Sequence, residues 1–190
     1  MKLTLPTQLT LARVIAIPLM GLAYYVDLPH NTIIAALIFI VAAITDWLDG
    51  YLARRLNQAS AFGAFLDPVA DKLIVATALA VLLQQDPRLA VMIPAAIIIG
   101  REITISALRE WMAELGQRSK VNVAGLGKWK TGFQMTAISM MLWREDFGPL
   151  PIYDIGYGLL LVASVLTVWS MCLYLRAAWP SFQNLSLIHI

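Results

Sequence analysis

The sequence predicts an all-α integral membrane protein with six transmembrane helices and a short interfacial segment at its N-terminus. Of the 190 residues, 59% are hydrophobic and only 14% are charged, a balance that ordinary soluble domains do not have. Apolar segments of about 20 residues recur, which is the length needed to cross a bilayer. We expect a single membrane domain over residues 1–190, with the tail after about residue 180 at its periphery.

Six such segments follow one another with short connections between them. The predicted spans are about 9–26, 31–53, 64–84, 89–112, 129–145 and 155–177. Lys and Arg gather in cytoplasmic connections, so their distribution indicates the orientation. Twelve of the 14 Lys and Arg residues fall on one side, and only Arg88 and Arg144 fall on the other. Both termini are therefore predicted to be cytoplasmic. No interleaving of basic and aromatic residues indicates a nucleic-acid partner.

Four aspartates interrupt the second and third predicted spans at helical spacing. Asp46 and Asp49 lie three residues apart, and Asp67 and Asp71 lie four apart, so each pair shares one face of its helix. The residues between them, at 55–62, include enough polar side chains to turn the chain. If the two helices pack side by side, all four carboxylates point at one pocket. A rise of about 22 Å from residue 31 to Asp46 places that pocket near the cytoplasmic edge of the membrane.

Small residues accompany the aspartates on these faces: Gly50, Ala53 and Gly63. They remove side-chain bulk, so a large ligand can approach the backbone. Four carboxylates in a partly dry pocket repel one another, and acids inside a membrane indicate a functional site. Two Mg²⁺ ions would balance them, and two-metal pockets serve displacement at phosphorus. The alternative is that the aspartates form structural salt bridges with Arg54, Arg55 and Lys72.

The pattern from Asp46 to Asp71, D-x2-D-G-x2-A-R-x8-G-x3-D-x3-D, resembles the signature of the CDP-alcohol phosphatidyltransferase family. Every specified position of that signature is filled. The resemblance implies Mg²⁺ or Mn²⁺ ions, expected to number two per active site, held by Asp46, Asp49 and Asp67, with Asp71 bordering the second. It also implies that Asp71 is the general base. The resemblance also assigns residues to the donor substrate, CDP-diacylglycerol: Gly50, Ala53 and Gly63 admit its cytidine, and Arg54 supports its diphosphate.

The N-terminal segment, residues 6–13, is similar to the P-N-x-L-T-x-x-R opening of the same family, although Thr7 stands where Asn is usual. In the family this segment borders the nucleotide site, so the resemblance makes Thr10 a candidate ligand-binding residue. An ordinary capped interfacial helix explains the same residues, because Pro and Thr are common at helix starts.

Two arginines, Arg101 and Arg109, lie in the fourth predicted span. A buried arginine must be paired or must line a watery cavity. Glu102 and Glu110 are possible structural partners. The functional interpretation is an anion site, because a guanidinium group matches phosphate oxygens bidentately.

Further basic residues follow in the next connection and at the start of the fifth span: Arg118, Lys120, Lys128 and Lys130. Contacts with anionic headgroups would explain the residues in the connection. Lys128 lies among Gly125, Gly127 and Thr131, which favours a phosphate cradle. The segments R-E-I-x3-A-L-R-E-W and G-K-W-K-T look like the glycerophosphate-specific branch of the family. This resemblance implies that the acceptor's phosphate is bound by Arg101, Arg109 and Lys128, with Arg118 and Lys130 as further candidates.

The last predicted span is apolar, and its aromatic residues Trp169, Tyr174 and Trp179 are interpreted as packing and an interfacial belt. Taken together, the resemblance implies transfer of a phosphatidyl group from CDP-diacylglycerol to sn-glycerol 3-phosphate with release of CMP. It further implies a homodimer in the bacterial inner membrane.

Two alternatives stay open. One keeps the chemistry with another acceptor, such as inositol phosphate or phosphatidylglycerol. The other is a cation- or proton-coupled transporter, against which the carboxylates lie near one face of the membrane rather than its midplane.

Overall fold

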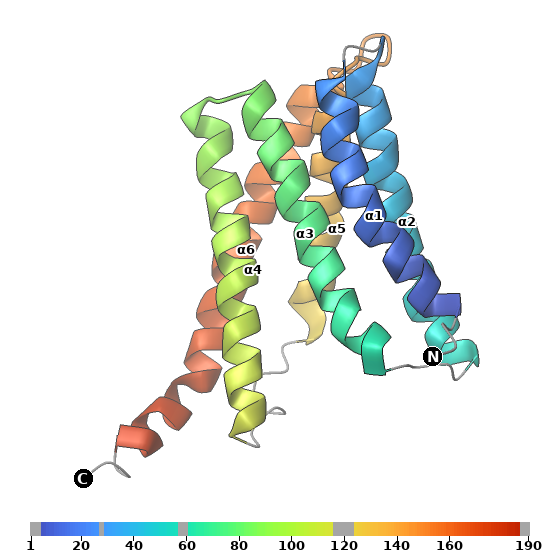
Figure 1. Ribbon diagram of the computed structural model, residues 1–190. Helices are drawn as coiled ribbons and strands as arrows, with labels where there is room; N and C mark the ends of the chain where they lie inside the picture. Colours follow the sequence, from blue (N-terminus) through green and yellow to red (C-terminus); the bar gives the residue numbers. More distant parts are fainter. Residues whose placement is uncertain (1–4, 27–28, 57–60, 116–123, 187–190) are drawn as a thin grey trace. The chain divides into compact units, whose positions relative to one another are not determined.

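Six helices make up the part of the chain that the computed structural model describes, residues 5–26, 29–56, 61–115 and 124–186. Within these ranges, the side chains at 5–6, 50, 52–54, 56, 61, 64, 124–128 and 180–186 are not described. The helices, shown in Figure 1, are α1 (Leu5–Tyr25), α2 (Asn31–Leu56), α3 (Ala61–Gln85), α4 (Leu89–Glu114), α5 (Ala124–Trp143) and α6 (Ile152–Ser186). No β-strand forms in these ranges, so the all-α prediction is confirmed.

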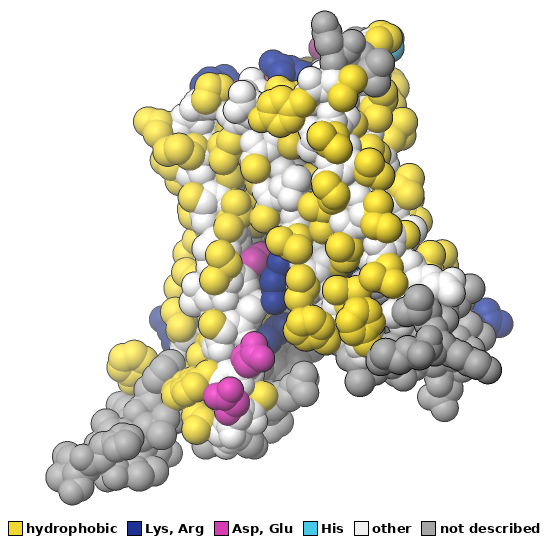
Figure 2. All heavy atoms as spheres, in the orientation of Figure 1, with side chains coloured by type: hydrophobic (Ala, Val, Ile, Leu, Met, Phe, Trp, Pro, Cys, Tyr) yellow, Lys and Arg dark blue, Asp and Glu magenta, His cyan; other side chains and the backbone are white. Residues whose placement is uncertain are grey.

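Four of the helices are long and apolar enough to cross a membrane, over Thr7–Tyr25, Asn31–Asp49, Leu89–Glu114 and Ile152–Trp179. Large apolar side chains on them stay exposed, for example Ile15, Val41 and Val165, and hydrophobic side chains are spread over the face drawn in Figure 2. In a membrane these side chains face lipid. The protein is therefore an integral membrane protein, as predicted. That α3 and α5 also cross the bilayer stays a prediction.

The expected interfacial segment is part of the first helix. Residues 6–13 continue into the apolar part of α1 without a break, because the helix runs from Leu5 to Tyr25. The consequence is that Thr10 and Arg13 are held at fixed helical positions, three residues apart on one face of α1.

The first compact unit, here called unit 1, comprises Met1–Arg88 and Met135–Tyr157. Within it α1 packs against both α2 and α3, whereas α2 and α3 contact each other far less. Many of its buried side chains are small, including Ala35, Ala36, Ala42, Ala70 and Ala78. Small residues let membrane helices approach closely. The helices α2 and α3 do contact each other, but α1 makes the main contacts with each of them.

The second compact unit, unit 2, comprises Leu89–Gln134 and Gly158–Ile190. Its core joins α4 to α6 through one cluster of buried residues: Ile105, Leu108, Met112, Tyr174 and Ala178. Trp111 and Met171 pack against this cluster. Tyr174 is thus a core residue, as the packing interpretation predicted, and the prediction of a single domain over 1–190 remains untested.

Candidate active site

Arg13 of α1 lies among three of the four aspartates. Its side chain is only 1% exposed, and its Nη1 atom lies 2.9 Å from Asp46 Oδ1. Nη2 is paired with Asp49 Oδ2, and Nη1 is also paired with Asp71 Oδ1. Asp46 and Asp49 come from α2 and Asp71 comes from α3, so one guanidinium group joins both halves of the motif.

The fourth aspartate meets the same face of α1 one turn earlier. Thr10 is buried and donates a hydrogen bond from Oγ1 to Asp67 Oδ1 at 2.5 Å. Thr10 and Arg13 are three residues apart and therefore share a helix face. That face places all four aspartates around one end of α1. The predicted convergence of the four carboxylates is real, and α1 brings it about.

The cluster retains negative charge after these contacts are made. The contacts given for the described side chains set four carboxylates against one guanidinium group, so acids outnumber bases there. Carboxylates gathered in this way favour protonation or additional cations. Oxygen donors of this kind suit hard divalent ions, and Mg²⁺ in particular uses one or two carboxylates together with substrate phosphates. Among the described side chains, no group of three His, Cys, Asp or Glu is arranged to hold a single ion. Carboxylate oxygens of this kind still fit a divalent cation whose other ligands would come from a phosphate.

One N–H group of the Arg13 guanidinium makes no hydrogen bond to the described residues. The Nε atom of Arg13 is buried and has no hydrogen-bond partner in the described part of the chain. Buried polar groups are normally satisfied, so each exception needs an explanation. An acceptor oxygen of a bound ligand would satisfy this atom.

The other residues of the motif lie on the same helices. Gly63 is buried near the start of α3. The last turns of α2 carry Gly50, Ala53 and Arg54. Their side chains are outside the described part of the structure. Their assigned roles toward cytidine and diphosphate stay predictions.

In unit 2, three of the predicted phosphate-binding residues surround two side chains that the sequence did not indicate as site residues. Glu102 Oε1 lies 3.2 Å from Arg101 Nη1 and accepts a hydrogen bond from Lys130 Nζ at 2.5 Å. Arg109 Nη2 donates to the hydroxyl of Tyr174 at 2.6 Å. Glu102 is thus a structural partner of the basic residues, one of the two interpretations that the sequence left open.

Tyr174 also orders the two arginines through its ring. The guanidinium carbons of Arg101 and Arg109 lie 5.5 and 5.1 Å from the ring centroid, within the range of cation–π contacts. Arg101 Nη2 further donates to Ser170 Oγ at 3.3 Å. Two cations share the one carboxylate of Glu102, and Arg109 adds a third positive charge, so the cluster keeps net positive charge. Arg118 and the side chain of Lys128 fall outside the described residues.

Sequence reasoning missed Arg13, Ser170 and Tyr174 as members of these clusters. Arg13 could have been found, because it closes the P-T-x-L-T-x-x-R segment at helical spacing from Thr10. Nothing in the sequence near Ser170 or Tyr174 indicates their pairing with α4, since that pairing joins residues more than 60 positions apart.

Residues 3–169 match the CDP-alcohol phosphatidyltransferase family. The chain belongs to this family. Enzymes of the family generally depend on a divalent metal ion, which agrees with the oxygen donors gathered around α1.

Curated relatives within the family are similar over nearly the whole chain. Proteins from Shigella flexneri serotype 5b (strain 8401) and Escherichia coli (strain K12) are each 53% identical over 178 residues. The match covers 94% of this chain and 96% of each relative. Both relatives are named CDP-diacylglycerol–glycerol-3-phosphate 3-phosphatidyltransferase. The family resemblance inferred from the aspartate motif is therefore confirmed.

Proposed function

We propose that this protein transfers the phosphatidyl group of CDP-diacylglycerol to sn-glycerol 3-phosphate, producing phosphatidylglycerol phosphate and CMP. The observation that carries the proposal is the convergence of all four motif aspartates on one face of α1. It occurs in a chain 53% identical to relatives named for this reaction. In this proposal the aspartates serve phosphatidyl transfer, and not the transport of ions or protons.

The reaction exchanges one phosphorus–oxygen bond for another. The acceptor hydroxyl attacks the phosphorus that carries the diacylglycerol, and the bond from that phosphorus to the CMP oxygen breaks. CMP leaves with the bonding electron pair. The proton of the hydroxyl passes to a carboxylate, for which we propose Asp71. This side chain is 41% exposed, so an acceptor hydroxyl can approach it to within hydrogen-bond distance.

Asp46, Asp49, Asp67 and Asp71 would hold the divalent ions, Mg²⁺ or Mn²⁺, two per site. When bound, such ions neutralise the diphosphate and the charge that develops on departing CMP. Arg13 holds three of these carboxylates in place and keeps one unused N–H donor, at Nε, for a phosphate oxygen. Thr10 fixes Asp67. Gly50, Ala53 and Gly63 would admit the cytidine, and Arg54 would support the diphosphate.

The acceptor's phosphate is assigned to Arg101, Arg109 and Lys128, with Arg118 and Lys130 as further contacts. Support comes from the excess positive charge of the cluster around Glu102 and Tyr174. Arg109 is fixed by the Tyr174 hydroxyl through a single N–H group, so other donors of its planar fork remain for a phosphate. Binding the phosphate positions the acceptor hydroxyl, a proximity effect that raises the rate.

The bilayer supplies CDP-diacylglycerol and receives the product. We further propose that the protein is a homodimer of the bacterial inner membrane, with both termini and the aspartates on the cytoplasmic side. The twelve Lys and Arg residues predicted on that side support this orientation.

The test is CMP release by purified protein in detergent, with CDP-diacylglycerol, Mg²⁺ and a panel of acceptors. We expect release with sn-glycerol 3-phosphate, loss of release on chelation, and a rate lowered about 10²–10⁴-fold by Asp71→Asn. Glu145→Gln is the matched control, because this exposed carboxylate pairs with His30 and not with the aspartates.

A second pair of variants tests the acceptor site. Arg109→Gln should raise the KM for glycerol 3-phosphate, whereas Arg176→Gln, an exposed arginine of the same unit, should not. Release with inositol phosphate or phosphatidylglycerol instead would keep the chemistry and overturn the acceptor. Folded protein that releases no CMP with any acceptor would overturn the enzyme itself and return the aspartates to the transport hypothesis.

A further inference from the structure

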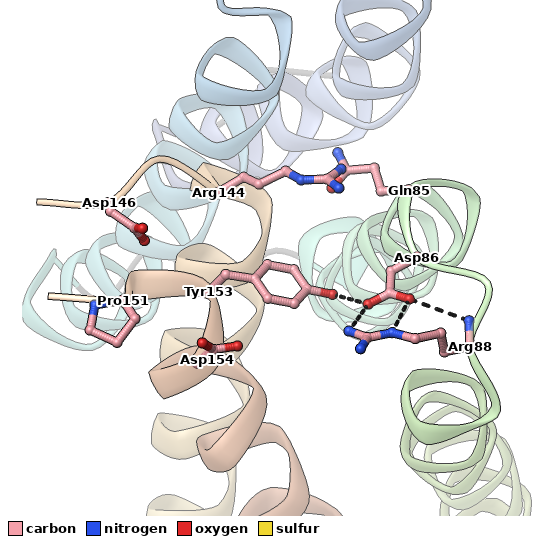
Figure 3. Close-up of a pocket in the computed structure, with 8 residues that line it drawn as sticks. All are labelled: Gln85, Asp86, Arg88, Arg144, Asp146, Pro151, Tyr153 and Asp154. Carbon is pink, nitrogen blue, oxygen red and sulfur yellow. Dashed lines mark hydrogen bonds and ion pairs between the residues drawn. The ribbon is translucent and has the colours of Figure 1, made fainter.

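A polar cavity lies at the end of α3 opposite the aspartates, and the proposed reaction does not use it. Its volume is about 370 Å³, and it is lined by residues from the end of α3, the connection after it, the connection between α5 and α6, and the start of α6 (Figure 3). All of these belong to unit 1. The 15 residues from Asp71 to Asp86 correspond to about 22 Å of helix, so the cavity is remote from the chemistry.

One wall of the cavity carries no net charge, and its polar side chains are hydrogen-bonded to one another. Arg88 donates to both oxygens of Asp86, from Nε at 2.7 Å and from Nη2 at 2.6 Å, and the Tyr153 hydroxyl donates to Asp86 Oδ2 at 2.5 Å. These donors hold the pKa of Asp86 well below its usual range, with Arg88 the largest cause. Asp86 is therefore ionised at neutral pH and its charge is balanced by Arg88. The Asp86–Arg88 pair is therefore a structural part of the wall, and a ligand would be recognised by other groups.

Three further groups line the cavity: the Gln85 amide, whose polar atoms are buried, and the exposed side chains of Arg144 and Asp154. Both polar atoms of the Gln85 amide are buried without a hydrogen-bond partner in the described part of the protein. Arg144 and Asp154 make no side-chain hydrogen bond or ion pair with any described residue. Figure 3 shows the Arg144 and Gln85 side chains pointing toward one another, with Asp154 on the far side of Tyr153. The cavity thus offers a solvent-exposed cation, a solvent-exposed anion and a buried amide that has no partner among the described residues.

The other acid of the cavity, Asp146, has a structural task. It accepts a hydrogen bond from the backbone N–H of Ile152 at 3.1 Å and so caps the start of α6. Asp154 is therefore the carboxylate that remains for a ligand.

The backbone conformation at Arg144 is one that glycine adopts more easily than arginine. Arg144 has φ of 65°, and its N–H bonds Met140 O at 3.3 Å just beyond the end of α5. Helices commonly close in this left-handed conformation with Gly. A side chain with a Cβ is disfavoured there. Backbone geometry therefore does not account for the arginine, and its charge in the cavity offers a reason.

The cavity lies where lipid headgroups would be. The candidate span Ile152–Trp179 begins beside it and α3 ends at Gln85. Phe147 and Leu150, in the connection that lines the cavity, are 57% and 53% exposed. Phe147 also stacks on Trp143 with ring centroids 5.5 Å apart. Exposed aromatic and aliphatic side chains at the end of a span are typical of the membrane interface.

We propose that this cavity binds the headgroup of a zwitterionic aminophospholipid, of the phosphoethanolamine type, from the leaflet opposite the aspartates. Its phosphate pairs with Arg144 and accepts from the Gln85 amide, and its ammonium donates to Asp154. An anionic headgroup is disfavoured because Asp154 would be left facing it. A choline headgroup carries no N–H group to donate to Asp154.

The test compares thermal unfolding of the purified protein in detergent with added phosphatidylethanolamine, phosphatidylglycerol or phosphatidylcholine of the same acyl chains. We expect phosphatidylethanolamine to raise Tm by about 5–10 °C at a hundredfold excess over its Kd. The other two lipids should raise it much less. Arg144→Gly should abolish the rise while leaving Tm without lipid unchanged or higher, because glycine suits φ of 65°.

His30→Gly is the matched control, since His30 has φ of 61° in unit 1 but does not line the cavity. It should keep the lipid response, and Asp154→Asn should weaken it. Equal responses to all three lipids, or an unchanged response in Arg144→Gly, would refute the proposal. So would an equal rise with soluble O-phosphoethanolamine, because the site would then bind a free metabolite. CMP release should be the same in Arg144→Gly as in wild type, so failure of this proposal leaves the proposed reaction untouched.

Discussion

Arg13 is the residue on which the two halves of the aspartate motif meet. It is almost completely buried, yet two of its three carboxylate partners, Asp46 and Asp71, are 38% and 41% exposed. Removing one partner of a buried ion pair typically costs about 3–5 kcal/mol, and solvent reduces that cost for the exposed partners. The guanidinium group is therefore expected to contribute substantially to the stability of unit 1, beside its proposed role toward phosphate.

We predict that Arg13→Met lowers the free energy of unfolding by about 2–4 kcal/mol. The reason is that three carboxylates then repel one another without a balancing charge. Arg13→Lys should lie between, because an ammonium group cannot span three carboxylates as the planar fork does. The measurement is thermal unfolding in detergent with EDTA.

Added Mg²⁺ should stabilise Arg13→Met more than it stabilises wild type, since a cation then has no guanidinium competitor. The control is Arg55→Met, an exposed arginine bonded to Tyr51. An Arg13→Met protein as stable as wild type in EDTA would contradict the structural role of Arg13.

At the scale of the elements, two close approaches organise unit 1. The first is that of α1 to α2 and α3, which lets one face of α1 carry both Thr10 and Arg13 to the aspartates. The second is that of α5 to the start of α6. A Cβ added at Gly156 would come within 2.9 Å of Met140 Cβ and of Met141 Cγ. Small residues at such positions let membrane helices approach each other.

We predict that Gly156→Ala lowers stability by about 1–3 kcal/mol, the usual cost of overpacking. The neighbours of this Cβ include the Ala137 carbonyl oxygen at 3.1 Å, which cannot move aside as a flexible side-chain end can. Gly158→Ala is the control two residues later, where an added Cβ meets nothing within 4 Å. That change should be neutral or stabilise by up to about 1 kcal/mol through helix propensity. The measurement is thermal unfolding of both variants. Equal Tm values for the two variants would argue against a close approach of α5 at Gly156.

At the scale of the whole molecule, the distribution of charge sets the orientation in the membrane. Twelve basic residues are predicted on the side of the aspartates and two on the other. This asymmetry supports the proposal that the aspartates lie on the cytoplasmic side and the cavity at Arg144 on the opposite side.

We predict that Phe147→Cys reacts with a membrane-impermeant maleimide in spheroplasts, whereas Arg55→Cys reacts only after permeabilisation. Both positions are exposed in the structure, so a lack of labelling reports the membrane barrier. Cys172 is the one native cysteine and is exposed; both variants therefore need Cys172→Ser as their background. The reverse pattern of labelling would invert the orientation and contradict the assigned face of the aspartates.

The sequence by itself determined the class of protein, the helices and the chemistry of the motif. Hydrophobic length predicts spanning helices because bilayer thickness fixes their size. The spacing of Asp46, Asp49, Asp67 and Asp71 predicts shared faces because a helix has a fixed period. Such local rules need only neighbouring residues.

Only the tertiary structure decided which helix gathers the aspartates and which basic residues are already paired. Arg13 joins α2 to α3, and Tyr174 orders Arg101 and Arg109 from α6. The cavity at Gln85, Asp86 and Arg144 likewise unites segments far apart in the chain. These contacts depend on how helices pack, which is a sum of many small side-chain contacts and leaves no periodic signal in the sequence.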